Sequence, residues 1–107
     1  MSKFDARRSY AREKFGSAVD IMATSPASIQ DRLNDAFMSF SPVQAADFQD
    51  VEEQQLFKDI YSGLTSKPAL GDEGTVRATL NLMNDDEASR IASLIVSLNF
   101  RLSSDDM

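Results

Sequence analysis

Carboxylates are the most numerous side chains in this sequence that can do acid–base or metal chemistry. They cluster at Glu52–Glu53, Asp72–Glu73, Asp85–Glu87 and Asp105–Asp106. Two carboxylates held in a cleft with separated pKa values can act as the acid and the base of a hydrolase. Asp85–Glu87, however, directly follows Asn84, which is the pattern of a helix start, where negative charge is stabilising. Asp72 lacks the repeated oxygen ligands of a calcium loop, so we favour capping over catalysis or metal binding.

Other catalytic chemistry is limited by the residues that are missing. The chain has no cysteine and no histidine, which removes thiolate nucleophiles, disulfides, the commonest general base and the commonest transition-metal ligand. Its serines have no Gly-x-Ser-x-Gly elbow, and Gly71 and Gly74 are not followed by the Gly-Lys-Ser/Thr of a phosphate loop. Ser66 and Lys67 are adjacent in a loop and do not supply the geometry of a Ser–Lys pair. We therefore predict no enzymatic activity, no catalytic residue, no metal and no cofactor.

The formal net charge of −6 is distributed unevenly along the chain. Residues 1–14 hold five basic and two acidic residues, whereas the remainder holds six basic and fifteen acidic residues. The candidate basic surface comprises Lys3, Arg7, Arg8, Tyr10, Arg12 and Lys14. Lys3, Arg7, Tyr10 and Lys14 recur at helical spacing along one flank.

Three interpretations of this basic flank remain open. Its side chains can follow the phosphates of a nucleic acid, with Tyr10 stacking on a base. Alternatively, the flank is a solvated helix face whose Arg and Lys stems cover the edge of the core. A third alternative is pairing with an acidic helix such as Asp50–Glu53, within one chain or between subunits. We favour the solvated face, because the rest of the molecule is acidic and repels nucleic acid.

Helical periodicity dominates the rest of the sequence. Apolar residues recur at helical spacing in five segments, which predicts helices over residues 4–23, 26–40, 51–62, 75–83 and 85–102. A single helical turn is expected within residues 43–47, and a loop over residues 65–74. Helix starts are predicted at Ser2, at Ser25 before Pro26, at Asp50 and at Asn84, and Gly63 is predicted to end the third helix. Gly16 is a potential weak point of the first helix.

These segments predict the fold class and the domain organisation. Period-two alternation and Asn-Gly or Asp-Gly hairpin turns are missing, so no strand is expected. A chain of 107 residues forms one domain. We therefore predict an all-α single domain, a small helical bundle of about five helices. Residues 1–23 form a basic amphipathic N-terminal helix, residues 24–102 the bundle, and residues 103–107 a frayed tail.

Three apolar residues lie off the predicted core stripes. Met38 projects opposite Ile29, and Phe100 projects opposite Ile91 with Val96 near it, by helical-wheel geometry. A helix that is apolar on two faces is usually central or part of an interface. Met38, Val96 and Phe100 are therefore candidate contacts with a partner protein or a second copy of the chain. The alternative is that a neighbouring helix covers them.

Composition leads to a functional hypothesis by elimination. The N-terminus has no apolar signal-peptide core, no apolar stretch is as long as a membrane span, and cysteine is absent, so we expect a cytoplasmic protein without membrane contact. We expect a non-enzymatic protein–protein interaction protein: an adaptor, regulator or inhibitor, such as an antitoxin- or immunity-like partner. The acidic bulk would speed association with a basic partner. The alternative function is nucleic-acid binding through the basic flank of the N-terminal helix.

Overall fold

The protein is an all-α globule of five helices and one short 3-10 turn. The structure, a computed structural model, describes residues 3–67 and 74–104, with side chains from Ala6 onward. The elements are α1 (Lys3–Thr24), α2 (Ile29–Phe40), η1 (Ala45–Asp47), α3 (Val51–Leu64), α4 (Thr75–Asn81) and α5 (Asp85–Ser104). The described residues contain no strand, so the predicted fold class is confirmed.

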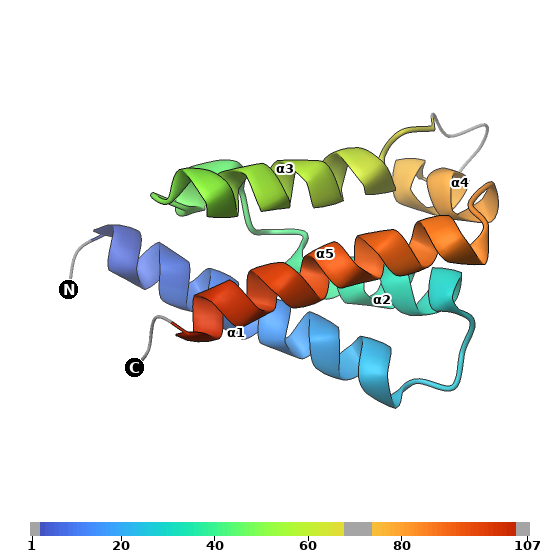
Figure 1. Cartoon of the computed structure of the whole chain (residues 1–107), viewed down its shortest axis with the longest axis horizontal. Helices are drawn as coiled ribbons and strands as arrows, with labels where there is room; N and C mark the ends of the chain where they lie inside the picture. Colours follow the sequence, from blue (N-terminus) through green and yellow to red (C-terminus); the bar gives the residue numbers. More distant parts are fainter. Residues whose placement is uncertain (1–2, 68–73, 105–107) are drawn as a thin grey trace.

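Helix α5 is the central element of the bundle. It lies in the foreground of Figure 1, between α1 and α3, with α2 behind it. Helices α3 and α5 run antiparallel, since Arg101 near the end of α5 contacts Asp50 at the start of α3, and Ile91 lies beside Gly63. One side of α5 therefore packs on the bundle, and none of the described helices covers the opposite side.

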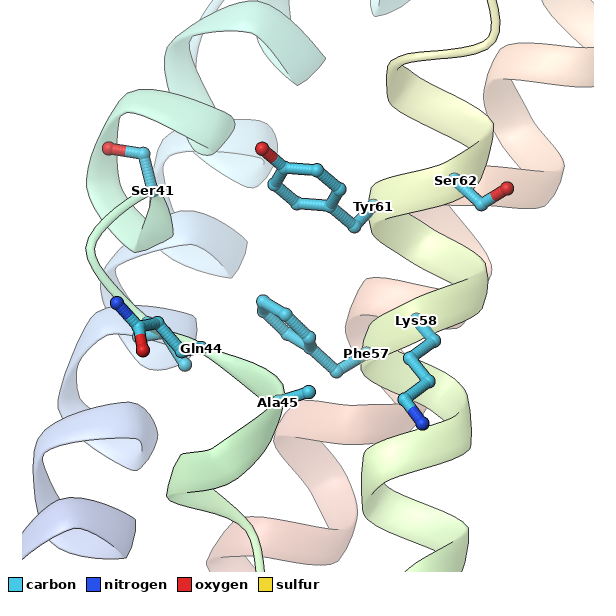
Figure 2. A pocket seen from close by; sticks show the side chains of 8 residues that line it. Ser41, Gln44, Ala45, Phe57, Lys58, Tyr61 and Ser62 are labelled. Atoms are coloured by element: carbon cyan, nitrogen blue, oxygen red, sulfur yellow. The ribbon is translucent and has the colours of Figure 1, made fainter.

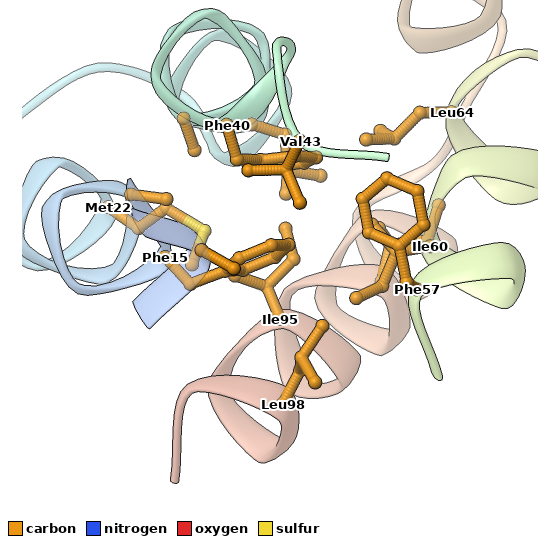
Figure 3. Close-up of a cluster of buried hydrophobic side chains, with 14 of the residues drawn as sticks. Phe15, Met22, Phe40, Val43, Phe57, Ile60, Leu64, Ile95 and Leu98 are labelled. Carbon is orange, nitrogen blue, oxygen red and sulfur yellow. The ribbon is translucent and has the colours of Figure 1, made fainter. Parts of the chain in front are cut away.

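The core is built around a cluster of aromatic rings (Figure 3). Phe15 of α1 stacks on Phe40 of α2 with ring centroids 4.6 Å apart, and it meets Phe57 of α3 edge-on at 6.2 Å. Phe57 in turn lies 5.6 Å from the ring of Phe48. Helix α1 is therefore an integral part of the bundle, and the buried side chains on its core face are Ala11, Phe15, Ala18 and Met22.

Two of the predicted helix starts are confirmed, and one is wrong. The side chain of Asp50 accepts a hydrogen bond from the backbone N–H of Glu53, and Asn84 accepts one from Glu87. Helix α2, in contrast, begins at Ile29 rather than Pro26, and its cap is Ser28. The hydroxyl oxygen of Ser25 instead accepts from the N–H of Ala27 in a local turn, which delays the helix. The predicted cap Ser2 lies outside the described residues.

Several helix ends also differ from prediction. Helix α3 continues past Gly63 to Leu64, because Gly63 does not adopt the positive φ that ends a helix. Helix α4 stops at Asn81, two residues early, and α5 extends through Ser104, so Ser103 and Ser104 are helical rather than frayed. The rest of the predicted tail, residues 105–107, lies outside the described residues. The turn predicted within residues 43–47 is η1.

Two helical glycines provide a matched test of packing. A Cβ added at Gly16 would meet only Asn99 Oδ1, at 3.8 Å, so Gly16→Ala should stabilise the fold by about 0.5–1 kcal/mol through helix propensity. A Cβ at Gly63 would lie 3.0 Å from Cδ1 of Ile91, so the same change there should gain less or destabilise. Urea unfolding of both variants measures the difference. Equal gains at the two sites would contradict the close packing of α3 against α5.

Candidate functional site

Two arginines of the candidate basic surface on α1 contact carboxylates of the same chain. Arg7 lies 4.0 Å from Asp47 and donates to the carbonyl of Ala46 at 3.5 Å. Arg8 forms an ion pair with Glu53. The ammonium of Lys14 lies 5.3 Å from the centre of the Tyr10 ring. The pairing of Arg8 with Glu53 is the intramolecular alternative that the sequence offered.

The remaining residues of the candidate basic surface are Lys3 and Arg12. Nothing is described of the Lys3 side chain, and Arg12 also makes an interaction in the folded chain.

Glu53, which forms an ion pair with Arg8, is the most deeply buried charged side chain among the described residues. Glu53 is 2% exposed, and its two carboxylate oxygens accept from Arg8 Nη2 at 2.7 Å and from Nε at 3.3 Å. Arg8 Nη2 also lies 3.5 Å from the carbonyl of Arg101. One guanidinium thereby joins α1, α3 and α5. Such two-point contacts fix geometry as well as charge.

A second guanidinium extends this network to the surface. Arg101 lies 3.3 Å from Asp50 and 3.0 Å from Glu52, and both carboxylates are in the first turn or at the cap of α3. The backbone N–H of Glu53, helped by the charge of Arg101, holds the pKa of Asp50 below its ordinary value. Asp50 therefore stabilises the fold when ionised, and this contribution is lost as the pH falls through that lowered pKa.

The charged hollow is a depression of about 280 Å³ at this junction of α3 and α5. The residues that line it are Asp50, Glu53, Phe100, Arg101 and Ser104. The carboxylates of Asp50, Glu52 and Glu53 gather around it, and among the described side chains Arg8 and Arg101 form ion pairs with them. In the part of the network that the structure describes, three carboxylates therefore share two guanidinium groups.

The aromatic hollow is a larger depression of about 460 Å³ between α3 and the segment that follows α2. Its lining residues are Ser41, Val43, Gln44, Ala45, Phe57, Lys58, Tyr61 and Ser62. Figure 2 shows the rings of Phe57 and Tyr61 projecting from α3 towards Ser41 and Gln44 across the gap. Its size is within the range of about 300–1,000 Å³ that is usual for ligand sites.

Aromatic contacts support the wall of the aromatic hollow from behind. The ring of Tyr61 lies 6.1 Å from the rings of both Phe57 and Phe37. Phe57 is 5% exposed, whereas Tyr61 is 45% exposed. In the part of the chain that the structure describes, the Lys58 ammonium has no ion pair and the Tyr61 hydroxyl has no hydrogen bond. The hollow thus combines a fixed apolar wall with an unpaired cation and a free hydroxyl.

The three apolar candidates are exposed, but they do not form one surface. The exposed fractions are 70% for Met38, 48% for Val96 and 71% for Phe100. Met38 lies about one helical turn before Ser41, which lines the aromatic hollow, but Met38 itself is not a lining residue. Val96 and Phe100 are one turn apart on the outward side of α5, and α2 packs on the inward side. The core consequently separates Met38 from the other two.

The carboxylate clusters have structural partners where they are described. Asp85 accepts a hydrogen bond at 2.8 Å from the side chain of Gln30, which ties the start of α5 to α2. No three potential metal-ligating side chains converge among the described residues. Asp72 and Glu73 lie outside those residues. Over the described ranges, no helix is both long enough and apolar enough to cross a membrane.

Comparison with known proteins identifies no relative of this chain. The sequence matches no protein-family model, no curated protein and no solved structure at a significant level.

Proposed function

We propose that this chain is a non-enzymatic binding protein, an adaptor, regulator or inhibitor of the antitoxin or immunity type, that works in the cytoplasm. The observation that carries this proposal is the aromatic hollow. It is open to solvent, it has a preformed aromatic wall, and the exposed Met38 lies about one helical turn before its lining residue Ser41. Hollows of this kind accept the buried aromatic or aliphatic anchors that dominate the energy of protein interfaces.

The chemistry of the hollow specifies the partner segment. An aromatic or large aliphatic side chain fits between Phe57 and Tyr61 on one side and Val43 on the other. Lys58 lies at the rim without an ion pair among the described residues, so a carboxylate beside the anchor residue would complete the contact. The occupant that we propose is therefore a partner-protein segment with an apolar anchor next to an acidic residue.

The contacts of α1 favour this function over nucleic-acid binding. The guanidinium groups of Arg7 and Arg8 face the carboxylates of Asp47 and Glu53, which reduces the positive charge available to phosphates. The molecule as a whole carries a net charge of −6. A gel-shift assay at low salt separates the two functions, since retardation of nucleic acid there would favour the basic flank.

Site-specific cross-linking tests the proposed contact. A photo-reactive phenylalanine derivative placed at Tyr61 should cross-link one partner in the producing cells. The same residue at Val51 should not, because Val51 is 76% exposed but lies about 15 Å along α3 by helical rise. The cross-linked partner is identified and purified for binding measurements with the unmodified chain.

Affinity measurements with that partner complete the test. Tyr61→Ala should weaken binding at least about tenfold, since truncation of an anchor contact typically costs about 2 kcal/mol or more. Adding Lys58→Glu to Tyr61→Ala should weaken binding further, because the new carboxylate would face the carboxylate of the partner. Val51→Ser is the matched control and should leave the affinity unchanged. Equal cross-linking at both positions, or full affinity in Tyr61→Ala, would remove the aromatic hollow as the binding site.

A further inference from the structure

The outward side of α5 differs from the rest of the molecular surface. From Ile91 to Phe100 the helix has no charged residue, although about a quarter of the whole chain, 26%, is charged. The exposed side chains on this α5 face are Ser89, Ser93, Val96, Ser97, Phe100 and Ser104. Helix α5 lies in the foreground of Figure 1 with α1 and α3 on either side, and no other described helix covers these exposed side chains.

From the α5 face and the charged hollow beside it, we propose that a second copy of this chain docks on α5 in antiparallel orientation. Each copy carries a net charge of −6, so two copies repel over most of their surface. A two-fold contact brings each surface against itself, and a charged residue near the axis would meet its own copy. The α5 face is a long surface on which two copies meet without opposing like charges.

Side-chain sizes on the α5 face are also self-complementary. When two α5 helices cross antiparallel about Val96 and Ser97, Phe100 of one copy lies over Ser93 of the other. The small serines leave room for the ring, which is 71% exposed in the single chain. Each dimer therefore buries two phenylalanine side chains, one on each side of the axis.

Arg90 supplies the charge complementarity that fixes the antiparallel direction. It precedes Arg101 by about three helical turns, so both lie on the flank of α5 that faces α3. Arg90 forms no ion pair with the residues that the structure describes. An antiparallel arrangement about a two-fold axis places the α3-facing flanks of both α5 helices on the same side of the dimer. In this arrangement Arg90 of one copy lies opposite Ser103 of the other. There it meets the charged hollow, where the carboxylates of Asp50 and Glu52 share one cation, Arg101, among the described side chains.

Sedimentation and cross-linking test this arrangement. The wild-type chain should sediment as a dimer, and Phe100→Ser and Arg90→Glu should each raise the dimer dissociation constant at least about tenfold. The double change Arg90→Glu/Glu52→Arg should recover part of that loss, because it exchanges the two charges across the interface. All these side chains are exposed or partly exposed, so circular dichroism should report an unchanged fold.

Because the chain has no cysteine, single cysteines report the direction of packing. Ser97→Cys lies at the axis and should form a disulfide with its own copy on mild oxidation. Two copies of Ser104→Cys should not, since they lie about 22 Å apart in the antiparallel crossing by helical rise. A monomer at high concentration, a dimer insensitive to Phe100→Ser and Arg90→Glu, or efficient cross-linking at residue 104 would overturn the proposal. None of these results depends on binding at the aromatic hollow.

Discussion

Replacing Phe15 with alanine should destabilise the fold by about 3–5 kcal/mol, the usual cost of removing a buried phenylalanine ring. Phe15 is 0% exposed, stacks on Phe40 and contacts Phe57 edge-on, so its removal leaves a cavity where three helices meet. A domain of this kind has a total stability of about 5–15 kcal/mol. The variant should therefore lose a large part of its stability, and Phe15→Leu should lose less.

The measurement is urea unfolding followed by circular dichroism, with Phe100→Ala as the matched control. Phe100 carries the same ring on the surface, so in the single chain its truncation should change stability by no more than about 0.5 kcal/mol. The comparison belongs at low protein concentration, where association does not contribute. A Phe15→Ala variant as stable as Phe100→Ala would contradict the position of α1 in the core.

The helices were predictable from sequence because local signals marked their cores and two of their starts. The caps at Asp50 and Asn84 each combine a side-chain acceptor with a backbone donor three residues later, so no distant contact is needed to specify them. The start of α2 was predicted at Ser25, directly before Pro26. The structure uses Ser28 rather than Ser25, and Arg32 also binds the carbonyls of Met22 and Ala27 in this connection. The delayed start therefore involves both these contacts and the local turn in which Ser25 accepts from the N–H of Ala27.

The hollows and the buried ion pair depend on contacts between distant segments. The aromatic hollow combines residues that follow α2 with residues of α3, and periodicity within one helix does not report such pairing. Glu53 did give a signal, since it falls in register with the apolar residues Phe57, Ile60 and Leu64 of the same helix. A carboxylate on a core stripe predicts a buried cation, but only the fold identifies that cation as Arg8.

Replacing Arg8 with methionine should destabilise the protein by about 3–5 kcal/mol, the range observed when one member of a buried ion pair is removed. Methionine keeps much of the apolar stem of arginine and removes the charge. Glu53, which is 2% exposed, then loses both of the hydrogen bonds that Arg8 donates to it.

The double variant Arg8→Met/Glu53→Leu separates the cost of an orphaned charge from the worth of the pair. Replacing both members of a buried pair with apolar residues of similar volume is often neutral or stabilising, so the double variant should recover most of the stability that Arg8→Met loses. Urea unfolding of the two single variants and the double variant gives the coupling energy. If the double variant is as unstable as Arg8→Met, the cost lies in other contacts of Arg8, such as the one to the carbonyl of Arg101. Recovery would instead show that the pair joins α1 to α3 in a fixed arrangement while adding little net stability.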